Sequence, residues 1–471
     1  MSASHSFAAA SSFTCGQTSQ VALDQRFRAC HGRIVAALTR RFGVQRFAFI
    51  ENAVQDAYVR ALERWPSEGT PAEPERWLVR AAHNAMIDAL RREAPMRPLD
   101  RSHEVPVDPP TLDSDDELRL MFLCSDPALT RAAQIALMLN VTFGLTAGQI
   151  ATAFLTDERT VAQRLVRAKK RLRDEGVQFD VPEANALPAR LSTMFDVLYI
   201  VFSEGFNPTD DDAALDSGLC NEALRLVRLL TETKPTAVPA AFALRALLCF
   251  HASRVPARVA DDGSLLLMPE QDRARWDSAL LSEAFTCLND AGTGTELTRF
   301  HIEAAIAACH ALGTTYATTD WARIADLYDL LRQCSPSLVV DVNRALAKAM
   351  DSGARVGLDE LDAIPEREVL GRYPYALAAY ADLHASLGNL DEARAYLDRA
   401  LANQSSPAQH ALLKRKRAAL DETHAVAVFG SDRPGGTAQL RARLEGYWTR
   451  TLDSLKARLE ADYIPDDSES D

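Results

Sequence analysis

The chain has 471 residues, of which 47% are hydrophobic and 25% charged, and its formal net charge is −13. This composition predicts a folded protein of two or three domains with a large core. No apolar run approaches the roughly 18–20 residues that a bilayer span requires, so we expect no membrane association. The overall acidity argues against a protein that coats nucleic acid with its whole surface, but it allows local basic patches.

The first 20 residues lack a basic start and a long apolar segment, so we expect a disordered leader and not a secretion signal. The eight cysteines are scattered and form no CxxC pair. This spacing favours a reduced, cytoplasmic protein, and it gives no reason to expect a metal site or a cofactor.

Helical periodicity dominates the chain, and we expect an all-α fold. The first domain covers residues 21–93 and contains three predicted helices. The second of these helices covers 50–65 and is expected to end at Pro66, because proline breaks a helix interior. The third covers 75–92 and is expected to expose His83. The following segment, 94–116, is rich in proline and acidic residues, so we expect a linker that does not fold alone.

A helix-turn-helix pattern occupies residues 117–176. Gly144 breaks an apolar helix, and Thr146 and Gln149 then fit a capping box, in which each side chain bonds the backbone of the other residue. Asp157 is placed to cap the next helix. Two helices joined by such a short turn are typical of DNA-binding proteins, whose second helix enters the major groove.

The charge of this segment supports DNA binding. From Arg131 to Arg173 there are eight Arg and Lys residues and two acidic ones, a balance of +6. An apolar stripe should face the core: Val161, Leu165, Ala168 and Leu172. Largely off this stripe lie Arg159, Gln163, Arg164, Arg167, Lys170 and Arg171. Arg and Gln suit base edges, and Lys and Arg suit phosphates. The alternative is a basic, solvated helix in some other bundle.

Two stretches together resemble region 2 of the extracytoplasmic-function sigma factors of the sigma-70 family. They are IENAVQDAYVRALERW at 50–65 and PERWLVRAAHNAMIDALRR at 74–92. The helix-turn-helix resembles region 4 of that family, and the order of the regions and the linker between them also match. The resemblance covers about residues 21–175. It implies a transcription initiation factor with no catalysis of its own, since the polymerase performs the chemistry.

The resemblance also implies contact surfaces for core RNA polymerase, through its β′ and β subunits, and for promoter DNA. The surface for the β′ clamp helices comprises Gln55, Asp56, Val59, Arg60 and Glu63. The surface for the melted −10 element comprises Arg76, Arg80, His83, Asn84, Asp88 and Arg91. The surface for the −35 element comprises Arg159, Thr160, Gln163, Arg164, Arg167 and, beside them, Lys170.

Beyond Asp180 helical patterns continue, and residues 180–425 form a predicted repeat domain. Its sequence GNLDEARAYLDRAL at 388–401 matches the second half of a tetratricopeptide repeat. The chain resembles a subgroup of sigma factors with such an extension, although Ser125–Asp126 replaces the expected Cys–His. This domain is expected to regulate the sigma regions or to bind a regulatory protein. Residues 426–471 should form a hinge, a terminal helix and an acidic tail.

Two other functions fit parts of this pattern. One is a stand-alone helix-turn-helix transcriptional regulator with a helical sensor domain, which would have no need of the region-2 helices. The other is an enzyme on a helical scaffold, which would need a deep pocket lined by the polar cluster at 270–277. A network of ion pairs that joins helices is the simpler interpretation of that cluster.

Overall fold

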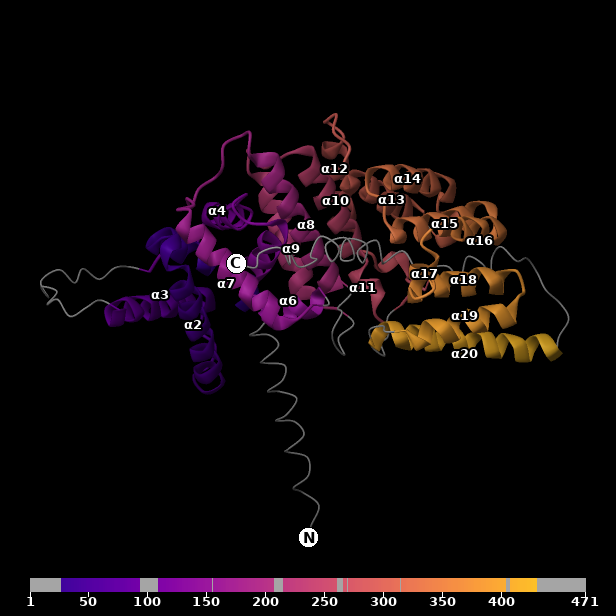
Figure 1. Cartoon of the computed structure of the whole chain (residues 1–471), viewed down its shortest axis with the longest axis horizontal. Coiled ribbons are helices and arrows are strands. Elements are labelled where there is room, and N and C mark those ends of the chain that lie inside the picture. The colour runs from indigo at the N-terminus through magenta and orange to yellow at the C-terminus, as the bar shows by residue number, and fades with distance from the viewer. Residues whose placement is uncertain are drawn as a thin grey trace, which may run out of the picture. The chain divides into compact units, whose positions relative to one another are not determined.

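The structure of the protein is a computed structural model that describes residues 27–93, 109–154, 156–206, 215–260, 266–268, 270–313, 315–403 and 407–429 (Figure 1). Over these ranges the chain is helical and has no strand, which confirms the predicted all-α fold. The expected leader, residues 94–108 of the linker, and the hinge, terminal helix and acidic tail from residue 430 onward lie outside the described residues, whereas residues 426–429 are the end of the last described helix. The chain divides into two compact units, Met1–Val197 and Leu198–Asp471, each of which is described by itself.

The first unit begins with a helix through residues 27–42, followed by the short η1 (Val44–Arg46), α2 (Phe47–Glu68) and α3 (Pro74–Glu93). The prediction that Pro66 ends the second helix is wrong, because α2 continues to Glu68. A proline removes the one hydrogen bond of its own N–H, and in the last turn of a helix this loss does not prevent the two following residues from staying helical. The helix ends at Gly69, whose N–H bonds the Trp65 carbonyl and whose φ of 85° favours glycine.

The next helices of this unit are α4 (Ser114–Cys124), α5 (Arg131–Phe143), α6 (Ala147–Ala153) and α7 (Glu158–Asp174). Their boundaries follow from local capping. Gly144 adopts the left-handed conformation after α5, and Thr146 and Gln149 form the predicted capping box of α6. The Asp157 carboxylate accepts the Thr160 N–H at 3.0 Å and begins α7. Helix α8 (Leu187–Phe206) crosses the boundary between the two units.

The second unit is a succession of helices: α9 (Ser217–Glu232), α10 (Pro239–Ser253), α11 (Val255–Arg258), η3 (Arg273–Arg275), α12 (Ser278–Ala291), α13 (Arg299–Leu312), η4 (Tyr316–Thr318), α14 (Trp321–Cys334), α15 (Leu338–Ser352), α16 (Ala354–Asp362), α17 (Arg367–Leu370), α18 (Pro374–Ser386), α19 (Leu390–Ala402) and α20 (Pro407–Phe429). Helix α10 packs against α9, α12 and α13, and from α13 onward most helices pack on the next one. In Figure 1, α18, α19 and α20 lie one beneath another.

The predicted repeat falls on the helix pair α18 and α19. Gly388 turns the chain between the two helices with φ of 86°. On α19, Ala393, Leu397 and Ala400 are at most 1% exposed, as expected for the small-large-small packing positions of a helical repeat. These residues belong to one continuous core that extends over the helices from α13 to α20. The resemblance to a tetratricopeptide repeat itself stays a prediction.

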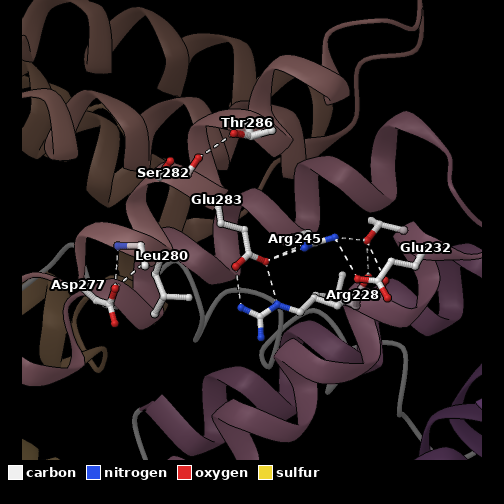
Figure 2. A network of polar contacts seen from close by, with 11 residues as sticks. Arg228, Glu232, Arg245, Asp277, Leu280, Ser282, Glu283 and Thr286 are labelled. Atoms are coloured by element: carbon white, nitrogen blue, oxygen red, sulfur yellow. Dashed lines mark hydrogen bonds and ion pairs between the residues drawn. The ribbon is translucent and has the colours of Figure 1, made fainter.

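An ion-pair network joins three helices of the second unit (Figure 2). The Glu283 carboxylate on α12 accepts hydrogen bonds from Arg228 on α9, at 2.6 and 2.8 Å, and from Arg245 on α10, at 2.9 Å. The bonds from Arg228 contribute most to lowering the pKa of Glu283 to about 2, against the opposing effect of burial. The carboxylate therefore stays ionised and holds the two arginines together.

The carboxylates of the polar cluster at 270–277 start helices or form an ion pair. Asp272 accepts the Ala274 N–H and starts η3, and Asp277 accepts two N–H groups at the start of α12. The second aspartate therefore begins a helix that is separate from η3. Glu270 pairs with Arg415 at 3.4 Å. None of the helices that the structure describes has the length and apolar character needed to cross a bilayer.

Candidate nucleic-acid interface

Helix α7 presents a basic face that begins at its capped N-terminus. The predicted apolar stripe is confirmed, since Val161, Leu165, Ala168 and Leu172 are at most 5% exposed. The candidate residues that lie exposed are Arg159, Gln163, Arg167 and Lys170. Thr160 and Arg164 are half-buried. The short helix α6 packs beneath α7, so the pair has the arrangement that places a second helix in a DNA groove.

Two of the eight basic residues counted in the sequence are used inside the protein. Arg131 donates to Thr193 and pairs with Asp196, both on α8. Lys169 bonds Glu51 on α2 at 2.6 Å and the Asn140 side chain at 3.0 Å. The charge that the helix-turn-helix offers to DNA is therefore smaller than the sequence count suggests.

Helix α2 has one buried face and one polar face. Its buried side includes Ile50, Val54 and Ala61, which are fully enclosed. All candidates for polymerase contact are exposed: Gln55, Asp56, Val59, Arg60 and Glu63. Val59 is 48% exposed, so this polar face includes one exposed apolar side chain near its centre. A surface of this kind suits a protein partner, and the polymerase contact stays a prediction.

Helix α3 carries most of the −10 candidates on its exposed side, which are Arg76, Arg80, Asn84, Asp88 and Arg91. His83 is different, and its predicted exposure is wrong: it is 3% exposed, with its ring centre 5.7 Å from that of Phe42. It shares the buried side of α3 with Val79 and Met86, at the spacing that places residues on one face. Trp77 packs edge-to-face on Trp65 at 5.5 Å, as expected of a core aromatic residue.

An open groove of about 1,170 Å³ lies beside the loop that precedes α3. Arg76 and Arg80 line one part of it, and residues 109–112 line another. The groove also reaches Cys30 of the first helix. It therefore combines two exposed guanidinium groups with enough room for a nucleotide base.

Comparison with known families finds a match for the part of the chain that contains α2 and α3 and another for the part that contains α6 and α7. Residues 27–95 match sigma-70 region 2, and residues 127–172 match sigma-70 region 4. The chain belongs to the sigma-70 family of RNA polymerase sigma factors. Core RNA polymerase and promoter DNA are accordingly its partners, and the family consists of transcription factors that perform no catalysis themselves.

The sigma regions account for less than half of the chain. Residues 190–292 match a family of unknown function, DUF6596. An uncharacterized protein of Rhizobium meliloti (strain 1021) is 36% identical over 394 residues, which cover 81% of this chain and 91% of that relative. No solved structure matches the chain. The similarity to this relative therefore extends well beyond the two sigma regions.

Region 2 and region 4 contact each other through positions that the sequence did not single out. A Cβ atom on Gly32, in the helix through 27–42, would lie only 2.6 Å from the Thr142 carbonyl oxygen on α5. The neighbouring His31 is 3% exposed, and burial, with a smaller effect of Lys169, lowers its pKa to about 4. Together with the Glu51–Lys169 pair, this close approach makes a continuous contact between the two regions.

Region 4 is also joined to the first half of α8. Arg190 pairs with Asp126 at 2.7 Å, and Thr193 donates to Gln134 at 3.0 Å. Gln134 in turn donates to the backbone carbonyl oxygens of Ser125 and Asp126. The residues at 125–126, which depart from the subgroup pattern, therefore connect region 4 to the start of the segment of unknown function.

Proposed function

We propose that the protein is a cytoplasmic sigma factor of the extracytoplasmic-function subgroup that directs core polymerase to specific promoters. The observation that carries the proposal is the exposure, on one compact unit, of a basic recognition helix and of the two region-2 surfaces. Gln55, Asp56, Val59, Arg60 and Glu63 dock on the β′ clamp helices. The docking surface is polar with one exposed valine, which suits a transient protein interface.

For the −10 element, we assign capture of a melted base to Arg76, Arg80 and Asn84, with Asp88 and Arg91 farther along α3. Promoter opening requires bases to leave the stack and to be held by polar and cationic groups. The groove beside the loop before α3 offers this volume and both arginines. His83 is left out of this set, because it is buried and supports the helix from inside.

For the −35 element, we assign base contacts to Arg159, Gln163 and Arg167, near the N-terminal half of α7. Lys170 lies farther along the same exposed face, so it suits a phosphate contact. The half-buried Thr160 and Arg164 lie beside them on α7.

We assign regulation to the C-terminal helical domain, which resembles tetratricopeptide repeats and offers a surface for a regulatory protein. The support for a regulatory role is that α8 bonds directly to region 4 through Arg190, Thr193 and Asp196. A change in the domain that moves α8 would therefore alter region 4.

Run-off transcription with bacterial core polymerase on a library of promoter fragments tests the proposal. The full chain is compared with versions that end after Glu175 and after Phe206, the second of which keeps all of α8. Initiation from specific sites by any version supports a sigma factor. If only the shorter versions initiate transcription, the C-terminal extension inhibits the sigma regions. If only the full chain initiates, the extension is required for initiation. Binding to duplex DNA without initiation by any version favours a stand-alone regulator.

A further inference from the structure

The second unit contains a small cavity, lined by polar and apolar side chains, that the sigma function does not use. It lies among α10, α13, α14 and the segment before α12. Its polar lining consists of His251, Arg254, Trp276, Glu303, His310 and Tyr328, and the rest is apolar. The volume of the cavity that the centre of a water molecule can occupy is about 30 Å³. Since about 10–15 Å³ admits one water, there is room for roughly two waters or one small ion.

Arg254 is the main charge in this cavity, and it is only 3% exposed. Its Nε donates to the Gln271 side chain at 3.2 Å, whereas its buried Nη2 has no acceptor. Within the described part of the chain it makes no ion pair with a carboxylate. Its guanidinium lies 5.7 Å from the centre of the Trp276 ring, a contact that favours the cation but satisfies none of its N–H groups. A buried arginine in this state lacks a counter-ion.

Two other residues of the lining also carry a polar atom that has no hydrogen-bond partner in the described part of the chain, and the inference uses both of them: Nε1 of Trp276, which is 7% exposed, and Nδ1 of His251, which is 8% exposed. Indole nitrogen is a donor only, and a neutral imidazole donates from one of its nitrogens. Arg254 and Trp276 therefore offer two buried donors to the same small space, and His251 adds a third in the tautomer that carries its proton on Nδ1.

The electrostatics around the cavity favour an anion. Burial, and then the charges of Arg258 and Arg273, lower the pKa of Arg254 to about 9. Burial, Arg254 and Arg258 lower the pKa of His251 to about 3, so its imidazole is neutral. The one carboxylate in the lining, Glu303, accepts the Tyr199 hydroxyl at 2.7 Å and lies 4.0 Å from Arg299. Neither of these two contacts is made to Arg254.

We infer that this cavity binds one small oxyanion, of the class of acetate, nitrate or inorganic phosphate, through Arg254, Trp276 and His251. The guanidinium provides the charge, and the indole and imidazole N–H groups complete the hydrogen bonds. Met268 lines both this cavity and an open depression of about 360 Å³. Movement of its flexible side chain would let the anion pass from the depression into the cavity. Because all three donors lie within residues 190–292, the site gives a ligand class to the segment of unknown function.

The inference is tested by calorimetry and thermal unfolding of the full chain, which do not depend on transcription. Sodium acetate, nitrate and phosphate are titrated separately against sodium chloride at equal ionic strength. The expected result is that at least one oxyanion binds and raises Tm, while chloride does not. The anion that binds most tightly distinguishes a carboxylate from an inorganic ligand. If none of the three binds or raises Tm, the inference is wrong.

Variants show whether the binding is at this cavity. Trp276→Phe keeps the ring and removes one N–H, and it should weaken binding about tenfold, as for one hydrogen bond to a charged group. Arg254→Gln should weaken binding more. Arg355→Gln is the matched control, since Arg355 is exposed and pairs with Asp359 in the same unit. Equal binding by wild type and Trp276→Phe would overturn the assignment even if Arg254→Gln did not fold.

Discussion

Replacing Gly32 by alanine should destabilise the first unit, although alanine is the better helix former. The alanine methyl group would lie 2.6 Å from the Thr142 carbonyl oxygen, which belongs to the backbone of α5 and cannot turn aside. Helix propensity alone would stabilise the variant by about 1 kcal/mol. Overpacking typically costs about 1–3 kcal/mol, so a net loss of up to about 2 kcal/mol is expected.

Gly148→Ala is the matched control. At this position of α6 the nearest atoms to an added Cβ belong to the Glu158 carboxyl group, at 3.5 Å, which is an ordinary contact. Its effect should therefore be a gain of up to about 1 kcal/mol from helix propensity alone. The two Gly→Ala changes are predicted to have opposite signs.

Urea unfolding of a version that ends after Phe206 measures both changes. The only tryptophans in that version are Trp65 and Trp77, so fluorescence follows region 2, and far-UV circular dichroism follows the helices of both regions. With a slope of about 2–3 kcal/mol per molar urea, a loss of 1–2 kcal/mol lowers the midpoint by roughly 0.5 M. A Gly32→Ala variant as stable as Gly148→Ala would refute the close contact between region 2 and region 4.

Three other predictions follow from exposure and charge. Replacing both Gln55 and Asp56 by alanine should weaken binding to core polymerase and leave the thermal unfolding of the protein unchanged, as measured by fluorescence anisotropy and calorimetry. Gln163→Ala should cost about 1–3 kcal/mol of affinity for the preferred −35 sequence, measured in parallel with altered sequences. Glu283→Gln should lower stability at pH 7 by about 1–3 kcal/mol in denaturant unfolding, because Arg228 and Arg245 lose a charged acceptor.

Each of these predictions has an outcome that contradicts it. Unchanged polymerase affinity would remove the docking role of α2. An equal loss of affinity for all DNA sequences would make Gln163 a backbone contact, as is expected for Lys170→Ala. Because the pKa of Glu283 is lowered to about 2, the wild-type advantage over Glu283→Gln should be complete above about pH 4.5 and disappear as the pH falls toward 2. An advantage that persists at pH 2 would exclude the carboxylate as its cause.

Local chemistry made the helix-turn-helix predictable. Thr146 and Asp157 act on N–H groups within three residues, so their capping roles can be recognised without knowing the tertiary structure. Periodicity likewise identified the buried stripe of α7. Pro66 misled the prediction because position relative to the helix end, and not residue type alone, decides what a proline costs.

The errors at the candidate site arise from contacts between distant parts of the chain. Arg131 and Lys169 look like DNA contacts in the sequence, but their partners Asp196 and Glu51 are 65 and 118 residues away. His83 was placed on the exposed side because a polar residue suits that side, whereas Phe42 provides a ring for it to pack on. The cavity in the second unit was also hidden, since its donors come from separate helices and connections.

The Glu51–Lys169 contact has a thermodynamic consequence for promoter search. Arg159 lies ten residues from Lys169 along α7, about 15 Å at 1.5 Å per residue, so the −35 surface is close to region 2 in this conformation. Elements named −10 and −35 lie about 25 base pairs apart, or about 85 Å along B-DNA. Under the proposed function, the two regions must separate before both elements are bound.

The free chain is then an equilibrium in which only the separated form is competent. Each 1.4 kcal/mol by which the contact favours the closed form lowers the apparent affinity for polymerase and promoter about tenfold. Weakening this contact, for example by Lys169→Met, would raise that affinity without touching either binding surface. A single internal ion pair can in this way set the concentration at which the factor begins to compete for polymerase.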